Sequence, residues 1–201
     1  ARLPFERSYP ACVIVEEETG AGESERDSFL ERLSSVLESG LAVDAVVAES
    51  DTQARRIWSL RDGVTEAISR AGLTHKFDVT VPPAAMPAFL DQMEAFGEEA
   101  GELRTLLFGH LGDGNIHVNM MQMPGLSQAA FYAKGPALAE RIYGHVAKLH
   151  GSISAEHGIG IAKRGYLHHS RSTEEVDLMR GVKHLLDPDC MLNPGVLFES
   201  N

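Results

Sequence analysis

An Asp-Gly step between two apolar runs, at Asp113 and Gly114, constrains the fold of this chain more than any other feature. Asp-Gly in this setting is the strongest short-range signal for a two-residue β-hairpin turn of type I′. With these two residues as the turn, counting outward places His110 directly opposite His117 on one face of the hairpin. Asn119 projects from the same face, because side chains alternate along a strand. The sequence therefore predicts an antiparallel hairpin with these polar side chains gathered on one face.

Two imidazoles on directly opposed residues can bind one cation. Their Cβ atoms would lie about 4.5–5.5 Å apart, which lets both rings reach a zinc ion at the ~2.0–2.1 Å bonding distance. The alternative is a hairpin whose histidines only pack or form hydrogen bonds. A one-residue shift in register would send His110 and His117 to opposite faces, so the hypothesis depends on the register.

A second Gly-rich stretch, from Ser154 to Gly160, supplies a carboxylate beside another histidine. Glu156 would complete a set of two histidines and one carboxylate, which leaves positions open for substrate in a catalytic metal site. Zinc, manganese, cobalt and iron(II) all accept such ligands. An imidazole can accept a proton near neutral pH, so His157 is a candidate general base. Without the hairpin, this Glu-His pair would be an ordinary surface dipeptide.

Arginine, lysine and hydroxyl side chains form a candidate site for a small anion. Trp58, Arg61 and Thr65 follow the i, i+3, i+7 spacing of one helix stripe. The planar fork of Arg61 suits carboxylate recognition, and Lys76 lies on the following strand, where it shares a face with Asp78. The alternatives are an Arg61 paired with a neighbouring acidic residue and a Trp58 that packs in the core.

Apolar periodicity and capping signals place helices and strands along the rest of the chain. Strands are expected at 10–17, 42–48 and 74–81 and in two runs between 103 and 121, with a turn at 18–25. Helices are expected at 25–39, 52–70 and 84–100. Two more helices are expected, one that begins at Gly135-Pro136 and one that runs from the Ser172/Glu175 capping box to Leu186. These elements predict an α+β fold, a single domain over residues 1–201 with one antiparallel sheet and helices packed on it.

Composition excludes several classes of function. Eighteen Lys and Arg against 29 Asp and Glu give a net charge of −11, and such an acidic chain without a basic cluster argues against nucleic-acid binding. Cys12 and Cys190 lie outside any CxxC spacing, which excludes a disulfide framework and indicates a reducing, cytoplasmic compartment. No apolar run approaches the ~20 residues of a membrane span.

Three segments, taken together and in order, resemble the C-terminal domain of the FAD-linked 2-hydroxyacid dehydrogenases, which oxidise acids such as D-2-hydroxyglutarate, D-lactate and glycolate. The segments are His110-Leu-Gly-Asp-Gly-Asn-Ile-His117, Glu156-His157-Gly158-Ile159-Gly160 and Leu192-Asn193-Pro194-Gly195. The resemblance covers nearly the whole chain. Residues 60–67 and 76–78 are most similar to the D-2-hydroxyglutarate branch.

The resemblance implies a role for each candidate residue. His110, His117 and Glu156 would hold a divalent metal, commonly zinc, and His157 would remove the proton of the substrate hydroxyl. The residues implied to bind the substrate carboxylates are Arg61, Thr65, Lys76 and Asn119, and those implied to lie near the flavin are Asn193 and Gly195. The implied fold is a ferredoxin-like cap domain.

The sequence departs from the family pattern in two ways. Val196 follows Asn193-Pro194-Gly195, where many members have a lysine. The family's N-terminal FAD-binding domain is absent, and Gly158-Ile159-Gly160 does not continue into a GxGxxG phosphate loop. We therefore expect this chain to act with an N-terminal FAD domain of the same polypeptide and a small 2-hydroxyacid, and to be inactive alone. The alternative is a stand-alone metal- or carboxylate-binding module without catalysis.

Overall fold

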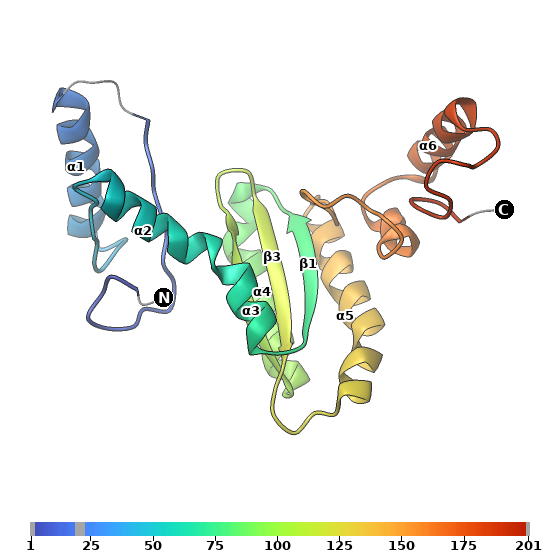
Figure 1. Ribbon diagram of the computed structural model, residues 1–201, viewed down its shortest axis with the longest axis horizontal. Helices are drawn as coiled ribbons and strands as arrows, with labels where there is room; N and C mark the ends of the chain where they lie inside the picture. The colour runs from blue at the N-terminus through green and yellow to red at the C-terminus, as the bar shows by residue number, and fades with distance from the viewer. Residues whose placement is uncertain (1–2, 19–22, 200–201) are drawn as a thin grey trace. The chain divides into compact units, whose positions relative to one another are not determined.

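The computed structural model describes residues 3–18 and 23–199 of the chain (Figure 1). Contacts between residues divide it into two compact units, Ala1–Arg70 and Ala71–Asn201. The single domain expected over residues 1–201 stays a prediction. The turn expected at 18–25 falls in large part on 19–22, outside the described residues.

The first unit is helical where the sequence predicts helices but lacks the predicted strands. Its helices are α1 (Glu23–Glu38), α2 (Asp51–Asp62) and most of α3 (Val64–Ala71). The strands predicted at 10–17 and 42–48 are wrong, because both segments have no regular secondary structure. Val13 and Val43 there are exposed. Runs of β-branched residues form a strand only where a partner strand and a packed face are available.

The single helix predicted at 52–70 is two helices that break at Gly63. Glycine is about 1 kcal/mol less favourable than alanine inside a helix, so a helix interrupts there at low cost. The N–H of Gly63 still donates to the carbonyl of Ser59 at 3.1 Å. Ser50 caps the start of α2 by accepting a hydrogen bond from the N–H of Gln53.

The second unit is built on a three-stranded antiparallel sheet in the order β1-β3-β2. Its elements run β1 (Thr74–Thr80), η1 (Pro83–Ala85), α4 (Met86–Ala100), β2 (Leu103–His110), β3 (Asn115–Gln122), α5 (Gln128–Lys148), η2 (Arg164–His169) and α6 (Thr173–Leu186). The other edge of β1 forms one antiparallel bridge, between Thr80 and Ser152. Strands and helices therefore follow the βαββαβ order of a ferredoxin-like fold, with the fourth strand reduced to this bridge. The predicted α+β fold is confirmed.

Helices α4 and α5 cover one face of this sheet and leave the other for polar side chains. Alternate residues of β3, Ile116, Val118 and Met120, are buried in one core cluster with Phe89 of α4 and Ile142 of α5. Burial of each such side chain contributes about 1.5–3 kcal/mol to folding. The intervening residues of the strand point to the opposite face.

Helix α5 begins earlier than the sequence predicts. The side chain of Ser127 accepts a hydrogen bond from the N–H of Ala130, so the helix starts at Gln128 and Pro136 lies inside it. Nε2 of His75 donates to the carbonyl of Phe131 at 2.9 Å.

The predicted capping box of α6 is confirmed. None of the helices in the described part of the chain has the length and apolar character of a membrane-spanning segment.

Candidate functional site

The hairpin that carries the two histidines has a register different from the predicted one. His110 pairs with Asn115, and Phe108 pairs with His117, so the predicted pairing of His110 with His117 is wrong by two residues. Because the displacement is even, both histidines still lie on the same face of the sheet. That face is the one opposite α4 and α5.

The register differs because the turn contains four residues, from Leu111 to Gly114. The carboxylate of Asp113 accepts a hydrogen bond from the N–H of Asn115 at 3.0 Å, which is an Asx turn. Gly114 has φ +75°, and its carbonyl accepts from the N–H of Val81 at 3.0 Å. The turn therefore closes on its own polar atoms and on the end of β1, which the Asp-Gly pattern alone does not encode.

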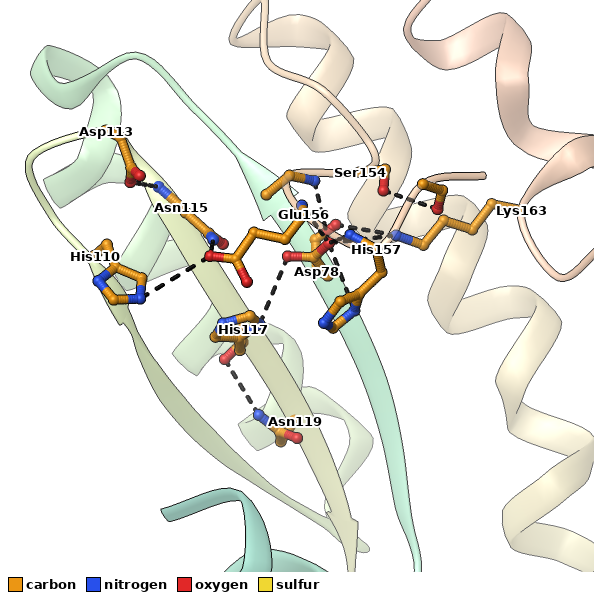
Figure 2. Close-up of polar contacts among 12 residues, drawn as sticks. Asp78, His110, Asp113, Asn115, His117, Asn119, Ser154, Glu156, His157 and Lys163 are labelled. Carbon is orange, nitrogen blue, oxygen red and sulfur yellow. Dashed lines mark hydrogen bonds and ion pairs between the residues drawn. The ribbon is translucent and has the colours of Figure 1, made fainter. Parts of the chain in front are cut away.

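A buried carboxylate, Asp78, lies at the centre of the polar face. Asp78 pairs with His117 across β1 and β3 and is 3% exposed. Its Oδ2 accepts hydrogen bonds from the backbone N–H groups of Ala155 at 3.2 Å, Glu156 at 2.9 Å and His157 at 2.9 Å. One side chain therefore fixes the Glu-His segment on the sheet (Figure 2).

Gly151 allows this segment to approach β1 closely. The N–H and carbonyl of Ser152 form hydrogen bonds with Thr80, both at 2.9 Å. A Cβ on Gly151 would lie 2.1 Å from the carbonyl oxygen of Thr80 and 2.8 Å from Cγ1 of Val146. A side chain at this position would push the chain away from the sheet.

Glu156 lies on the same face as the two histidines of the hairpin, beside His110. Its Oε1 accepts a hydrogen bond from Nδ2 of Asn115 at 2.6 Å and lies 4.0 Å from Nε2 of His110 (Figure 2). Both the glutamate and His110 are about half exposed, at 51% and 47%. The sequence-predicted carboxylate and histidine thus come together although 46 positions separate them.

Asp78 also lies between two imidazoles. Its Oδ1 is 3.6 Å from Nδ1 of His117, and its Oδ2 is 3.6 Å from Nδ1 of His157. The two imidazole rings are stacked with their centroids 5.7 Å apart. His157 is 64% exposed while Asp78 is buried, so this carboxylate can orient an imidazole that stays open to a ligand.

Lys163 places a positive charge next to the carboxylate of Asp78. Its Nζ donates to the carbonyl of Asp78 at 3.2 Å and lies 3.9 Å from Oδ2. Burial alone would raise the pKa of Asp78, but backbone hydrogen bonds from His157 and Glu156 and the charges of His157 and Lys163 lower it. Burial lowers the pKa of Lys163, and the charge of Asp78 opposes that effect. The carboxylate is therefore held in its charged form.

Two of the four predicted substrate-binding residues adjoin this cluster. Lys76 pairs with Asn119, one step along the same face from Asp78 and His117. Asn119 is buried and donates to the carbonyl of His117 at 3.2 Å, while Lys76 is exposed.

The other two predicted substrate-binding residues lie in the first unit. Arg61 is on α2 and Thr65 is on α3. Their part in the site stays a prediction.

The predicted flavin-side turn is tied to the segment that follows His157. Asn193 and Gly195 have positive φ, +48° and +75°. Nη1 of Arg164 donates to the carbonyl of Gly195 at 2.6 Å, and the N–H of Leu197 donates to the carbonyl of Gly160 at 3.3 Å. The turn and the Glu-His segment therefore belong to one connected part of the unit.

The donor chemistry of the face fits a divalent metal. His110, His117 and Glu156 are all present there, although their ligand atoms do not all lie within 4.8 Å of one another. Within the described part of the chain, Oδ1 of Asp78 and Oδ1 of Asn115 are buried acceptors without a hydrogen-bond partner. Uncompensated oxygens next to imidazoles favour a positive charge at this place.

Sequence reasoning missed three residues of this cluster. Asp78 is the only charged side chain among the buried residues of β1, but the strand also contains His75 and Lys76, so its sequence does not single out this carboxylate as buried. Asn115 follows the Asp-Gly step directly, but its contact with Glu156 spans 41 positions. Lys163 lies in a stretch without any local pattern, so no sequence signal points to it.

Comparison with known proteins finds a family model and several relatives that match nearly all of this chain. The family model described as FAD linked oxidases, C-terminal domain, matches residues 3–197. A D-2-hydroxyglutarate dehydrogenase from Xanthomonas citri pv. viticola is 41% identical over 202 residues, which cover 100% of this chain and 42% of that relative. A protein of the same name from Stutzerimonas stutzeri is 35% identical over 97% of this chain and 42% of its own length.

A plant relative extends the comparison beyond bacteria. A mitochondrial D-2-hydroxyglutarate dehydrogenase from Arabidopsis thaliana is 38% identical over 96% of this chain and 33% of its own length. The chain thus spans less than half the length of the relatives it matches.

Proposed function

Because this chain belongs to the family of C-terminal domains of FAD linked oxidases, we propose that it is the substrate- and metal-binding domain of an FAD-dependent D-2-hydroxyacid dehydrogenase. The observation that carries the proposal is the buried Asp78, whose carboxylate holds the Glu156-His157 backbone against His117 on the polar face of the sheet. The relatives' name indicates D-2-hydroxyglutarate as the substrate.

In this proposal, His157 accepts the proton of the substrate hydroxyl. Nδ1 of His157 faces Oδ2 of Asp78 at 3.6 Å, which leaves Nε2 for the substrate. Asp78 acts through His157 and is therefore a positioning residue. Oxidation removes the hydroxyl proton to Nε2 and a hydride from C2, and it leaves a 2-oxoacid. FAD, when bound, supplies the acceptor for that hydride.

Lys76 and Asn119 bind a substrate carboxylate. They form a directly paired cation and amide on the same face as Asp78 and His117. A lysine in addition to the metal-ligand cluster suits an acid with two carboxylates better than D-lactate or glycolate. Arg61 and Thr65 are proposed as further residues that bind the substrate carboxylates.

His110, His117 and Glu156 are the residues that would hold a divalent metal, with zinc as the first candidate. When bound, such an ion polarises the substrate hydroxyl and its neighbouring carboxylate. Asn115 keeps the Glu156 carboxylate on the sheet face by donating to Oε1 at 2.6 Å. Asn193 and Gly195 are proposed to lie near the flavin. The N-terminal domain of the same polypeptide would make most of the contacts with FAD.

Steady-state turnover by the flavin-loaded full-length protein tests this proposal. We expect oxidation of D-2-hydroxyglutarate to exceed that of D-lactate and glycolate. Lys76→Met should raise KM for D-2-hydroxyglutarate about 10–100-fold, the equivalent of one charge-assisted hydrogen bond, with little effect on D-lactate. Lys148→Met, on an exposed position of α5, is the matched control. Chelation should abolish turnover and added zinc should restore it.

Three outcomes would contradict the proposal. Unchanged turnover in the metal-free protein removes the metal's role, and equal KM effects on both acids remove the role of Lys76. Calorimetric binding of a 2-hydroxyacid without any turnover would support the binding module instead.

The cytoplasmic compartment stays a prediction. Cys12 and Cys190 are free, while the plant relative's name places that protein in mitochondria.

A further inference from the structure

A second group of metal-ligand side chains lies where η2 packs on α5. Glu140 projects from α5, and His168 and His169 are the last two residues of η2. One ligand atom from each of these three side chains lies within 4.8 Å of the others, an arrangement the structure shows for this group alone among the residues it describes. None of the three belongs to the cluster around Asp78.

The geometry of the group is held by packing beneath it. Leu167, the residue before the two histidines, is 5% exposed, and the ring of Tyr166 packs against Tyr143 of α5 with centroids 5.2 Å apart. A Cβ on Gly144, one turn along α5 from Glu140, would lie 3.8 Å from Cε1 of His169. This is an ordinary van der Waals distance, so the imidazole of His169 lies against this turn of the helix.

The three side chains already face one another. Nε2 of His169 lies 3.1 Å from Oε1 of Glu140, and the rings of His168 and His169 are 4.2 Å apart between centroids. The His169 side chain is 12% exposed and that of Glu140 is 59% exposed. One ligand is thus fixed in the protein and another is reachable from solvent, which gives an ion both a rigid anchor and an entry path.

We propose that Glu140, His168 and His169 form a second metal site, specific for a divalent transition ion such as zinc. Tetrahedral zinc with bonds of ~2.0–2.1 Å places its ligand atoms about 3.3 Å apart. Small side-chain rotations bring atoms that lie within 4.8 Å of one another to that spacing. Two imidazoles exclude magnesium and calcium, which take oxygen ligands, and three protein ligands leave a fourth position for water. Bound metal joins η2 to α5 and stabilises the second unit.

Zinc binding by the protein with its other candidate site removed tests this inference. In a His110→Ala, Glu156→Gln background, competition with a chromophoric zinc chelator should show one zinc per chain, and zinc but not magnesium should raise Tm. His168→Ala and Glu140→Gln, both at exposed side chains, should each weaken zinc binding by more than the ~10–100-fold that loss of an outer-shell partner costs. His184→Ala, at an exposed histidine of α6, should leave it unchanged.

Either of two results would overturn the inference. One is a background protein that binds no zinc, and the other is zinc binding that persists unchanged in His168→Ala and Glu140→Gln. His169→Ala should also abolish binding. If that variant fails to fold because its side chain is largely buried, the two exposed substitutions still decide the outcome.

Discussion

At the scale of single residues, one carboxylate organises most of the polar face. Asp78 is buried, accepts three backbone hydrogen bonds through one oxygen, and lies 3.6 Å from two imidazoles. Hydrogen bonds to a charged group contribute about 1.5–3 kcal/mol, roughly twice as much as neutral ones. Asp78 thus anchors the Glu156-His157 segment on the sheet and also positions the imidazole of His157.

Asp78→Asn should lower the free energy of unfolding by about 1.5–3 kcal/mol, because the amide keeps one acceptor oxygen but loses the charge that its three donors stabilise. Urea denaturation measures the change. Asp91→Asn, at an exposed position of α4, should stay within about 0.5 kcal/mol of the unsubstituted protein. Equal stability of the two variants would show that Asp78 does not anchor the segment.

Tyr143 makes stability fall at alkaline pH. Burial, followed by the charges of Tyr166 and Asp78, raises its pKa from 10.0 to about 12. A group whose pKa is higher in the folded protein stabilises the fold below its unfolded pKa and ceases to do so as pH rises through the folded pKa. Unfolding free energy should therefore decline between about pH 10 and pH 12.

Urea denaturation across that range measures the decline, which should be shallower in Tyr143→Phe. Tyr132→Phe, at a 54% exposed ring, should keep the original slope. The same slope in all three proteins would contradict the assigned cause.

At the scale of elements, glycines and turns set which residues meet. Gly151 allows the chain to lie against Thr80, and the four-residue turn fixes the register of β2 on β3. The sequence predicts β1, α4, the hairpin and α6 because each has a local signal: alternation, helical periodicity, Asp-Gly or a capping box. It does not predict the register, because the turn is held by the N–H of Val81, a contact from outside the hairpin.

Gly151→Ala should destabilise the protein by about 1–3 kcal/mol, the usual range for overpacking. The new Cβ would lie 2.1 Å from a backbone oxygen that cannot move without breaking the Thr80–Ser152 bridge. Gly181→Ala, inside α6 with open space around its Cβ, should instead stabilise by about 0.5–1 kcal/mol. Thermal unfolding distinguishes the two, and a neutral Gly151→Ala would show that the close approach is not needed.

At the scale of the whole chain, local patterns predict the sheet unit and the helices of the first unit, but they wrongly predict two strands in the first unit. The segments at 10–17 and 42–48 have strand-like composition but no strand, because composition does not supply a partner to pair with. The candidate site shows the same limit. His110, His117, Glu156 and His157 stand out in the sequence, whereas the contact of Glu156 with Asn115 is non-local and emerges only from the fold.

We propose above all that His157, oriented by Asp78, removes the hydroxyl proton of a D-2-hydroxyacid. The most direct measurement is the rate of anaerobic flavin reduction by D-2-hydroxyglutarate in the flavin-loaded full-length protein, followed by stopped-flow absorbance. His157→Asn should slow this step by about 10²–10⁴-fold, the usual contribution of a general base, while His184→Asn leaves it unchanged. A His157→Asn protein that reduces its flavin at the unaltered rate would contradict the account.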